Sequence, residues 1–386
     1  MKKQLTRIAS WMLLATMGQA GAFAQNIRID MSQTYPEKTI NLQKVADVKY
    51  IPLETTDEVL FNGIVTNLSA EGIAGFNKKE GDILVFDGTG KAIASFNHTG
   101  QGPNEYNKIY HLDVDWKQKE VYVQDNFRQK IRIYGLDGRH LRTIDLQETM
   151  QQGDLYNFSD THLIYYAQPK SKPVTPYEPV TLLSKKDPSK VTLPFTKTDD
   201  NLVKATGGPF GDMKMSAKNV NLLCKKGDEV YVNEVTADVI YRVESNHALT
   251  PVVERTPSYQ DASGQDFFLM LTGANARYYF FKRQQALLEF QGNAATDTKS
   301  TYVAYDRKEK QLLNPTFTNE DYPSQDIPMS KLLQCAGSAN RCYLQLEAFK
   351  LKEALAEGKL KGTLKSIAEK LDEEDNPVLM VVEFKK

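Results

Sequence analysis

The chain has 386 residues, of which 41% are hydrophobic and 25% are charged, and its formal net charge is −1. This composition is that of a globular protein with enough apolar residues for a large core. The balanced charge argues against a nucleic-acid-binding protein, because such proteins need a clustered basic surface.

The first 24 residues have the pattern of a signal peptide. A basic stretch, MKKQLTR, precedes a short apolar stretch, and Ala22-Phe23-Ala24 forms an A-x-A cleavage signal. The apolar stretch is shorter than the roughly 20 residues that a membrane span needs. We therefore expect cleavage near Ala24, a mature chain of residues 25–386 without a membrane span, and a periplasmic or secreted location.

Short alternating strands separated by Gly, Asp, Asn and Lys turns recur along the mature chain. The first such segment, DVKYIPLET at residues 47–55, has no evident partner nearby. Two later strand–turn–strand units, residues 82–96 and 130–144, match in pattern, with Gly90 and Gly138 at the same place in the turn. This match indicates an internal repeat.

Further copies of the unit follow, and a second hairpin precedes several units. The copies lie at residues 177–195, 238–253 and 300–313, and the preceding hairpins at residues 111–125, 219–234 and 276–290. Two hairpins make a four-stranded meander, and repeated meanders are typical of a β-propeller. The sequence thus predicts an all-β fold built from four-stranded antiparallel blades.

The end of the chain indicates how the ring closes. A final strand, NPVLMVVEF at residues 376–384, has no partner after it, so the segment 47–55 is expected to complete its blade. The five visible units and this composite blade predict a six-bladed propeller, a single domain spanning residues 25–386. A helical insertion is expected at about residues 350–373, where apolar residues recur at helical spacing and Gly358 and Gly362 divide the segment.

The stretch NHTGQGPNEY at residues 97–106 falls between an outer strand and the next inner strand, so it is the crossover between two blades. Its glycines and Pro103 suit a sharp change of direction. In an up-and-down blade, this crossover and the second turn within the blade lie on the same face. The residues expected to meet there, as candidate ligand-binding residues, are Gln101, Asn104, Glu105, Tyr106, Asp125, Asn126 and Arg128.

A structural role for this corner is the stronger interpretation. Asp125 and Asn126 suit Asx-type turns, and Glu105 is placed to reach Arg128 or main-chain amides and so lock neighbouring blades. We expect the corner to be chiefly a clamp between blades and only secondarily a binding surface.

Residues 100–144 resemble an NHL-type repeat, with its G-x-G-P-x-E-[FY] crossover followed by two hairpins. Together with YIPLET and EEDNPVLMVVEF, they make the chain similar to an exported six-bladed propeller family of Gram-negative gut anaerobes. The resemblance implies this fold and an exported protein. Many members carry a lipid-attachment cysteine after the signal peptide, and this chain lacks one.

Two functions fit these observations. The first is a binding or scaffolding module, a monomer that presents its loop face to a small polar ligand or a protein partner and needs no cofactor. The alternative is a metal-dependent hydrolase or lyase that holds a cation such as Ca²⁺ in the central channel. No nucleophile elbow, HExxH or P-loop motif is present, so an enzyme is the less favoured reading.

The three cysteines and one polar strand are the remaining candidates for a disulfide or a metal site. Cys335 and Cys342 flank a turn-forming stretch and could form a disulfide, with two free thiols as an equal alternative. Cys224 lies on an apolar run and is expected in the core. His111, Asp113 and Asp115 share one face of a strand, but a turn at Asp115 and hydrogen bonds between blades for the other two are a better explanation than a metal site.

Overall fold

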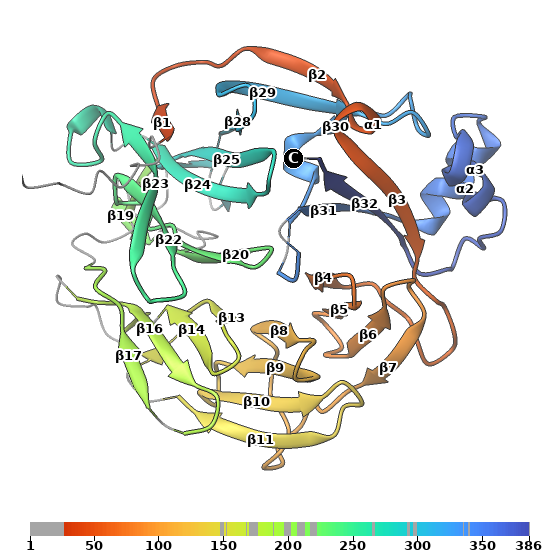
Figure 1. Cartoon of the computed structure of the whole chain (residues 1–386), viewed down its shortest axis with the longest axis horizontal. Coiled ribbons are helices and arrows are strands. Elements are labelled where there is room, and N and C mark those ends of the chain that lie inside the picture. Colours follow the sequence, from red (N-terminus) through yellow and green to blue (C-terminus); the bar gives the residue numbers. More distant parts are fainter. Residues whose placement is uncertain are drawn as a thin grey trace, which may run out of the picture.

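Six sheets stand around a central axis in chain order, so the six-bladed propeller is confirmed (Figure 1). The structure is a computed structural model. It describes residues 27–385 apart from 147–149, 152, 167, 170–176, 188, 197–201, 207–212, 217–221, 265–266, 292–293, 296–298, 335 and 339. The expected signal peptide, residues 1–24, lies outside the described residues.

The first three blades are antiparallel four-stranded sheets that begin at the axis and end at the rim. Blade 1 consists of β4 (Ile64–Leu68), β5 (Gly72–Phe76), β6 (Ile83–Asp87) and β7 (Ala92–Phe96). Blade 2 consists of β8 (His111–Asp115), β9 (Glu120–Asp125), β10 (Lys130–Gly135) and β11 (His140–Asp145). Blade 3 consists of β13 (Leu155–Asn157), β14 (His162–Tyr166), β16 (Val180–Ser184) and β17 (Lys190–Thr192). A small sheet of β12 (Met150–Gln151) and β15 (Gln168–Pro169) lies beside them.

Blades 4 and 5 follow the same plan. Blade 4 consists of β20 (Leu223–Lys226), β21 (Glu229–Val232), β22 (Val239–Val243) and β23 (Leu249–Thr256), followed by a 3-10 turn, Ala262–Gly264. Blade 5 consists of β24 (Phe267–Ala274), β25 (Tyr278–Gln285), β28 (Ser300–Asp306) and β29 (Gln311–Thr318), with β30 (Ile327–Pro328) and a 3-10 turn, Met329–Lys331, after it.

Blade 6 is assembled from both ends of the chain, as the sequence predicts. β31 (Arg341–Leu346) and β32 (Val378–Phe384) are completed on the outside by β3 (Ala46–Pro52), which pairs antiparallel with β32 along its whole length. Leu333 takes the innermost position, exchanging both main-chain hydrogen bonds with Tyr343 at 2.9 and 2.7 Å. The last blade is therefore closed by an N-terminal strand.

The N-terminal segment also covers the rims of two further blades, which the sequence did not indicate. β1 (Ile27–Asp30) adds parallel to β23 of blade 4, and β2 (Glu37–Asn41) adds parallel to β29 of blade 5. A short helix, α1 (Leu42–Val45), then leads into β3. Residues 27–52 thus form a strap along blades 4, 5 and 6 (Figure 1).

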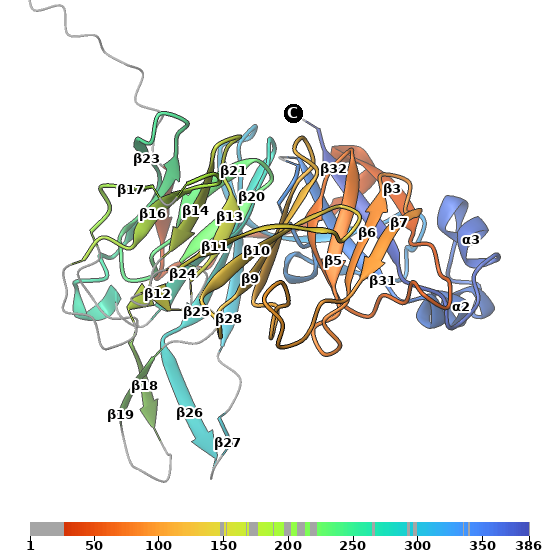
Figure 2. The ribbon, with the colours of Figure 1, turned by 90° about the horizontal axis from the view of Figure 1, so that it is seen from below.

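A second unpredicted feature is an arm that projects from one face of the ring (Figure 2). It pairs β18 (Leu202–Thr206) and β19 (Met213–Ser216) with β26 (Leu287–Gln291) and β27 (Ala294–Ala295). The hairpin expected at residues 276–290 is therefore wrong: β25 is the second strand of blade 5, and β26 leaves the blade to join the arm. Uninterrupted apolar alternation through this stretch gives no sign of where the chain leaves the sheet.

The expected helical insertion lies between β31 and β32 at the outer edge of blade 6. It consists of α2 (Ala348–Ala356) and α3 (Gly362–Ala368), with Gly358 at φ +69° between them. Leu351 and Leu364 are buried against the blade, in the same cluster as Val382. None of the helices among the described residues is long and apolar enough to cross a membrane.

The core lies between the blades, because alternate side chains of each strand face opposite neighbours. Val121 and Val123 pack toward blade 1, while Tyr122 packs toward blade 3. Every residue of β9 is buried, as in a strand covered on both faces. Blades in this ring are therefore held chiefly by apolar contacts, and the polar contacts at the axis and the corners fix their register.

Candidate functional site

The two segments that carry the seven candidate residues lie side by side at the corner between blades 1 and 2: Arg128 contacts residues 100–102, and Asp125 contacts Asn107. Residues 97–110 form the crossover from β7 to β8, and residues 126–129 form the turn between β9 and β10 beside it. The face that carries these two segments is called the crossover face below. At the next-but-one corner, residues 193–196 after β17 correspond to the crossover, and residues 233–238 between β21 and β22 correspond to the turn.

Arg128 holds the crossover in place. Its guanidinium donates hydrogen bonds to the carbonyl oxygens of Gly102 at 3.0 Å and Gly100 at 3.1 Å, and to Oε1 of Gln101 at 2.7 Å. Glu105 accepts a hydrogen bond from the Gly102 N–H at 2.6 Å, so it stabilises the turn from inside. Of the two partners that the sequence suggested for Glu105, a main-chain amide is the one found, while Arg128 binds the loop's carbonyls instead.

The other corner residues are also engaged in the fold. Tyr106 is fully buried, and its hydroxyl donates to the Gly81 carbonyl of blade 1 at 2.7 Å; burial raises its pKa to about 12. Asp125 is fully buried and accepts from the Asn107 N–H at 2.8 Å and from Arg132 at 3.4 Å. Asn126 accepts from Gln124 at 2.8 Å.

Gln101 and Asn104 keep exposed side chains, and Phe127 beside them is 74% exposed. These contacts describe a clamp, as expected, and ligand binding by the corner residues stays a prediction.

At the axis, Asp113 joins four blades. Its Oδ1 accepts hydrogen bonds from Asn67 of blade 1 at 2.7 Å and from the Val114 N–H at 2.8 Å. Its Oδ2 accepts from the Asn157 N–H of blade 3 at 2.8 Å and from Nζ of Lys225 of blade 4 at 3.4 Å. Asp113 is 1% exposed, so this carboxylate is a buried, fully used hub rather than an open ligand.

Blade 6 reaches the same region through Ala336. Its carbonyl accepts from the Leu68 N–H at 2.8 Å, and Ala336 bridges to both Asn67 of blade 1 and Gly227 of blade 4. Gly337, at φ +103°, follows so closely that a Cβ there would lie 2.4 Å from Oδ1 of Asn67. The inner strands are thus tied together across the axis.

Two titratable groups near the hub have displaced pKa values. Burial, with a smaller effect from Lys225, lowers the pKa of His111 to about 4, and its ring packs edge-on against Tyr156 at 4.7 Å. Burial raises the pKa of Asp154 to about 6, although the Leu223 N–H donates to it at 3.2 Å. Perturbed groups often mark functional sites, but structural networks perturb pKa values as well.

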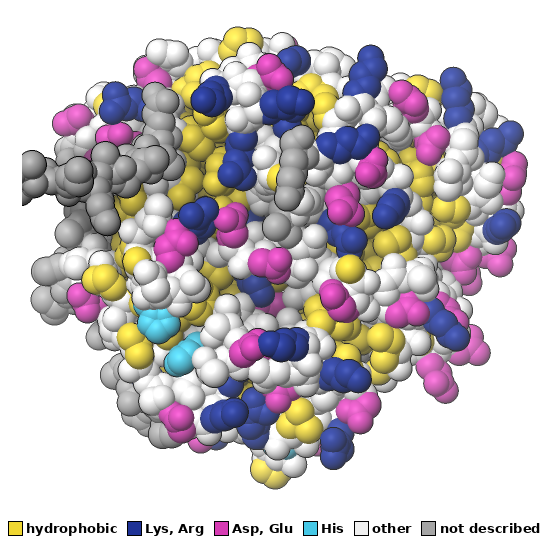
Figure 3. All heavy atoms as spheres, viewed as in Figure 1, with side chains coloured by type: hydrophobic (Ala, Val, Ile, Leu, Met, Phe, Trp, Pro, Cys, Tyr) yellow, Lys and Arg dark blue, Asp and Glu magenta, His cyan; other side chains and the backbone are white. Residues whose placement is uncertain are grey.

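Asp115 forms a buried ion pair with Lys185 of blade 3 at 2.7 Å, so the carboxylates of β8 all serve contacts between blades. Across the described ranges, no three His, Cys, Asp or Glu side chains are gathered as a metal-binding set. Lys and Arg alternate with Asp and Glu on the face of the ring seen in Figure 3.

The cysteines fit the expected core role in part. Cys224 is buried with a free thiol, as predicted. Cys342 is also buried, whereas Cys335 lies outside the described residues, so the disulfide between them and its alternative of two free thiols both stay predictions.

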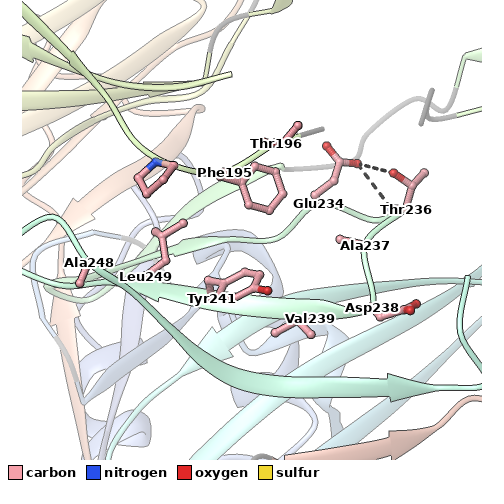
Figure 4. A pocket seen from close by; sticks show the side chains of 11 residues that line it. Phe195, Thr196, Glu234, Thr236, Ala237, Asp238, Val239, Tyr241, Ala248 and Leu249 are labelled. Atoms are coloured by element: carbon pink, nitrogen blue, oxygen red, sulfur yellow. Dashed lines mark hydrogen bonds between the residues drawn. The ribbon is translucent and has the colours of Figure 1, made fainter. Parts of the chain in front are cut away.

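A groove between blades 3 and 4, about 660 Å³ in volume, is the candidate ligand site (Figure 4). The blade 3–4 groove is lined by Pro194, Phe195, Thr196, Glu234, Thr236, Ala237, Asp238, Val239, Tyr241, Ala248 and Leu249. Its volume and largely apolar lining with a few polar groups are typical of small-molecule sites. Two other grooves, below α2 and between blades 2 and 3, have volumes of about 570 and 380 Å³ and mostly charged or polar linings.

The two ends of the groove differ in chemistry. Phe195 and Tyr241 come from the two blades and pack edge to face, with ring centres 6.1 Å apart and planes at 70°. At the other end, buried Glu234 accepts hydrogen bonds from the Tyr166 hydroxyl at 2.5 Å and from Thr236 Oγ1 at 3.2 Å. Burial and the charge of Glu234 raise the pKa of Tyr166 far above its usual value, so this phenol stays a donor.

Sequence reasoning missed this groove, although the signal was available. The topological rule that brings the blade 1–2 crossover beside the β9–β10 turn applies equally to blades 3 and 4. It places PFT, residues 194–196, beside EVTAD, residues 234–238. The glycines and proline of the first corner make it conspicuous, whereas the second corner has no comparable motif.

Sequence comparison identifies one family. The model of a family described as a domain of unknown function, DUF4934, matches residues 26–383. No curated protein sequence matches the chain.

Solved structures of other proteins share the fold. A Bacteroides fragilis NCTC 9343 protein, provisionally described as exported, is 15% identical with a TM-score of 0.63, covering 93% of this chain and 99% of that one. A DUF4221 member from Bacteroides vulgatus ATCC 8482 is 8% identical with a TM-score of 0.50, covering 89% and 98%. At these identities the likeness shows the fold alone.

Proposed function

We propose that this chain, which belongs to the DUF4934 family, is an exported binding module that holds a small polar ligand in the blade 3–4 groove. The observation that supports this most directly is the groove itself, with two aromatic rings in its wall at one end and a hydrogen-bonded carboxylate at the other. Rings supply contact area at small entropic cost, and a few fixed polar groups supply orientation.

Binding is favoured over catalysis by the state of the polar groups at the axis. Both oxygens of Asp113 accept hydrogen bonds from protein donors, and Lys225 brings a positive charge to the same carboxylate. A divalent cation would have to displace these donors. The alternative, a metal-dependent hydrolase or lyase using Ca²⁺, is tested by metal analysis of the gently purified protein, where one bound ion per chain would favour it.

Export is supported by the N-terminal sequence and by the position of β1. Cleavage after Ala24 would leave every strand intact, because β1 begins at Ile27. The Bacteroides fragilis structure provisionally described as exported is consistent with the same compartment. Mass spectrometry of the exported protein should give an N-terminus at or near Gln25, and an intact Met1 or a lipid adduct would contradict the proposal.

Ligand-observed NMR with phenol and benzyl alcohol as probes tests the groove. We expect saturation transfer to both probes in the wild type and its loss in Tyr241→Leu, because the ring that packs edge to face with Phe195 in the groove wall is removed. Phe127→Leu is the matched control, since it removes an exposed ring from the crossover face at the other corner. Loss of transfer in Phe127→Leu but not in Tyr241→Leu would move the site to the corner.

A further inference from the structure

Among the described residues, blade 6 has the shortest inner strand of the ring. The inner strands of blades 1 to 5, namely β4, β8, β13, β20 and β24, have three to eight residues. In blade 6 this place is taken by Leu333 alone, because the 3-10 turn Met329–Lys331 precedes it. Part of the edge of β31 is therefore left without a neighbouring strand in the described part of the chain.

The open edge lies at Gln345. Tyr343 exchanges both main-chain hydrogen bonds with Leu333, so its N–H and C=O point inward, away from β32. Main-chain groups alternate in direction along a strand, so those of Gln345, two residues further on, also point inward. Lys331 would lie opposite Gln345 if the inner strand continued, but it belongs to the 3-10 turn. Within the described chain, the main-chain N–H and C=O of Gln345 therefore have no hydrogen-bond partner.

The groove below α2 runs along this edge, at the corner between blades 5 and 6. Gln345 and Lys331 both line it, and its volume is about 570 Å³. Leu344 is only partly buried there, so it leaves area for contact with a further apolar side chain. The other apolar lining residues are Tyr322, Leu346, Leu351 and Ala354.

A strand added at this edge would carry its side chains in register with those of β31. The residue opposite Gln345 would direct its side chain toward blade 1, on the face of β31 that carries Tyr343. The residues on either side of it would face the groove with Leu344 and Leu346, which pack toward blade 5. An added segment therefore needs apolar side chains at alternate positions.

The charges that line the groove balance one another. Glu357 and Lys359 form an ion pair, and Glu347 accepts a hydrogen bond from the side chain of Gln345 at 3.2 Å. This balance disfavours a polyanion or a polycation and suits a segment without a strong net charge. The charged lining residues are Glu347, Glu353, Glu357, Lys331, Lys350 and Lys359.

We propose that the groove below α2 binds an extended peptide segment with apolar side chains at alternate positions, which pairs with the open edge of β31 and completes the inner strand of blade 6. Main-chain hydrogen bonds to Gln345 hold the segment, and its alternate side chains give selectivity. This binding does not rest on the blade 3–4 groove, which lies at a different corner and shares no residue with it.

The probe is the peptide acetyl-Thr-Val-Thr-Val-Thr-amide, which places its two valines on one side of an extended chain. Hydrogen exchange of the purified protein should show protection of residues 341–347 when the peptide is present, because the Gln345 N–H gains an acceptor. In isothermal titration calorimetry, the polar analogue acetyl-Thr-Asn-Thr-Asn-Thr-amide should bind at least about tenfold more weakly.

Gln345→Pro tests the main-chain hydrogen bond itself. Proline removes an inward N–H that has no partner among the described residues, so the fold should be kept and the affinity for the peptide should fall at least about tenfold. Gln345→Ala is the matched control, because it removes the side chain, keeps the N–H and should bind the peptide like the wild type. Tyr241→Leu, in the blade 3–4 groove, should also leave peptide binding unchanged.

Three results would overturn the proposal: equal affinities of Gln345→Pro and Gln345→Ala, no protection of residues 341–347, or no binding of the valine peptide at about 1 mM. Loss of peptide binding in Tyr241→Leu alone would move the peptide to the blade 3–4 groove. If Gln345→Pro lowers the thermal midpoint, hydrogen exchange and the comparison of the two peptides in the wild type decide.

Discussion

Individual buried carboxylates make many of the polar contacts between blades. Asp113 takes hydrogen bonds from its own blade and three others while 1% exposed. A buried charge of this kind costs desolvation energy and is tolerated only with well-placed donors. Its value is to fix the relative positions of inner strands that otherwise meet through apolar contacts.

Asp113→Ala should be strongly destabilising, because it leaves Lys225 and the amides of Asn67 and Asn157 without their acceptor. We expect a loss of about 3–5 kcal/mol in the free energy of unfolding, measured in urea. Asp160→Ala is the control, since Asp160 forms an exposed pair with Lys117 between blades 2 and 3 and should cost less than about 1 kcal/mol. Equal losses would show that Asp113 is not a hub.

His111 and Asp154 should give the stability opposing pH dependences between about pH 4 and 6.5. The folded-state pKa of His111 is lowered, so the unfolded chain binds the extra proton and stability rises with pH in this window. The folded-state pKa of Asp154 is raised, so the folded chain binds the extra proton and stability falls with pH. The two effects largely cancel in the wild type.

Removing one group should expose the other. Asp154→Asn should make stability rise from pH 4.5 to 6.5, and His111→Asn should make it fall, each by about 1–2 kcal/mol because both groups keep some contact with solvent. Urea unfolding at several pH values measures this. Slopes that match the wild type in both variants would refute the displaced pKa values.

At the scale of an element, the crossover at residues 97–110 shows that a sequence motif can predict a turn without predicting its side-chain contacts. Its glycines, Pro103 and the neighbouring strands predict a corner where the crossover lies beside the β9–β10 turn, and the contacts of Arg128 with residues 100–102 confirm that these two segments are neighbours. The partner of Arg128 depends on how the loop turns, and this follows from packing against Tyr106 and blade 1 rather than from spacing. Every residue has a main-chain carbonyl, so the sequence does not show which carbonyls a side chain such as Arg128 will bind.

Arg128→Ala should weaken this corner more than Glu105→Ala. Arg128 loses three acceptors on the crossover, which predicts a cost of about 1.5–3 kcal/mol, whereas Glu105 loses one amide contact and should cost about 1 kcal/mol. Arg139→Ala, an exposed arginine of the same blade, should stay within about 0.5 kcal/mol of the wild type. Thermal and urea unfolding give the comparison, and a larger loss from Glu105→Ala would reverse the assignment.

The strands show the same limit of sequence reasoning. The alternating pattern of the strands predicts the repeated hairpins, because alternate side chains of each strand pack against the blades on either side. β1 and β2 escape this signal, since they add to the rim in parallel and one of them, EKTIN, buries only Ile40. The same pattern does not predict the blade 3–4 groove either, because the groove is lined by residues of two blades that are far apart in the sequence.

For the whole molecule, the decisive feature is that one chain segment closes the ring. Residues 27–52 run along blades 4, 5 and 6, and β3 pairs with β32 from Ala46 opposite Phe384 to Pro52 opposite Val378. Without β3, β32 would present an open edge, and an open edge invites pairing with other chains. Closure therefore stabilises the ring and protects it from aggregation.

A chain that starts at residue 58 should fail to form the closed propeller, because it lacks all three strands of the strap. We expect a broad unfolding transition by circular dichroism in urea and a larger apparent mass in size-exclusion chromatography. A chain that starts at residue 36 lacks β1 alone; it should unfold cooperatively at a lower midpoint, because the burial of Ile29 is lost while β2 and β3 remain. A chain starting at residue 58 that unfolds cooperatively at the wild-type midpoint would show that β3 does not close the ring.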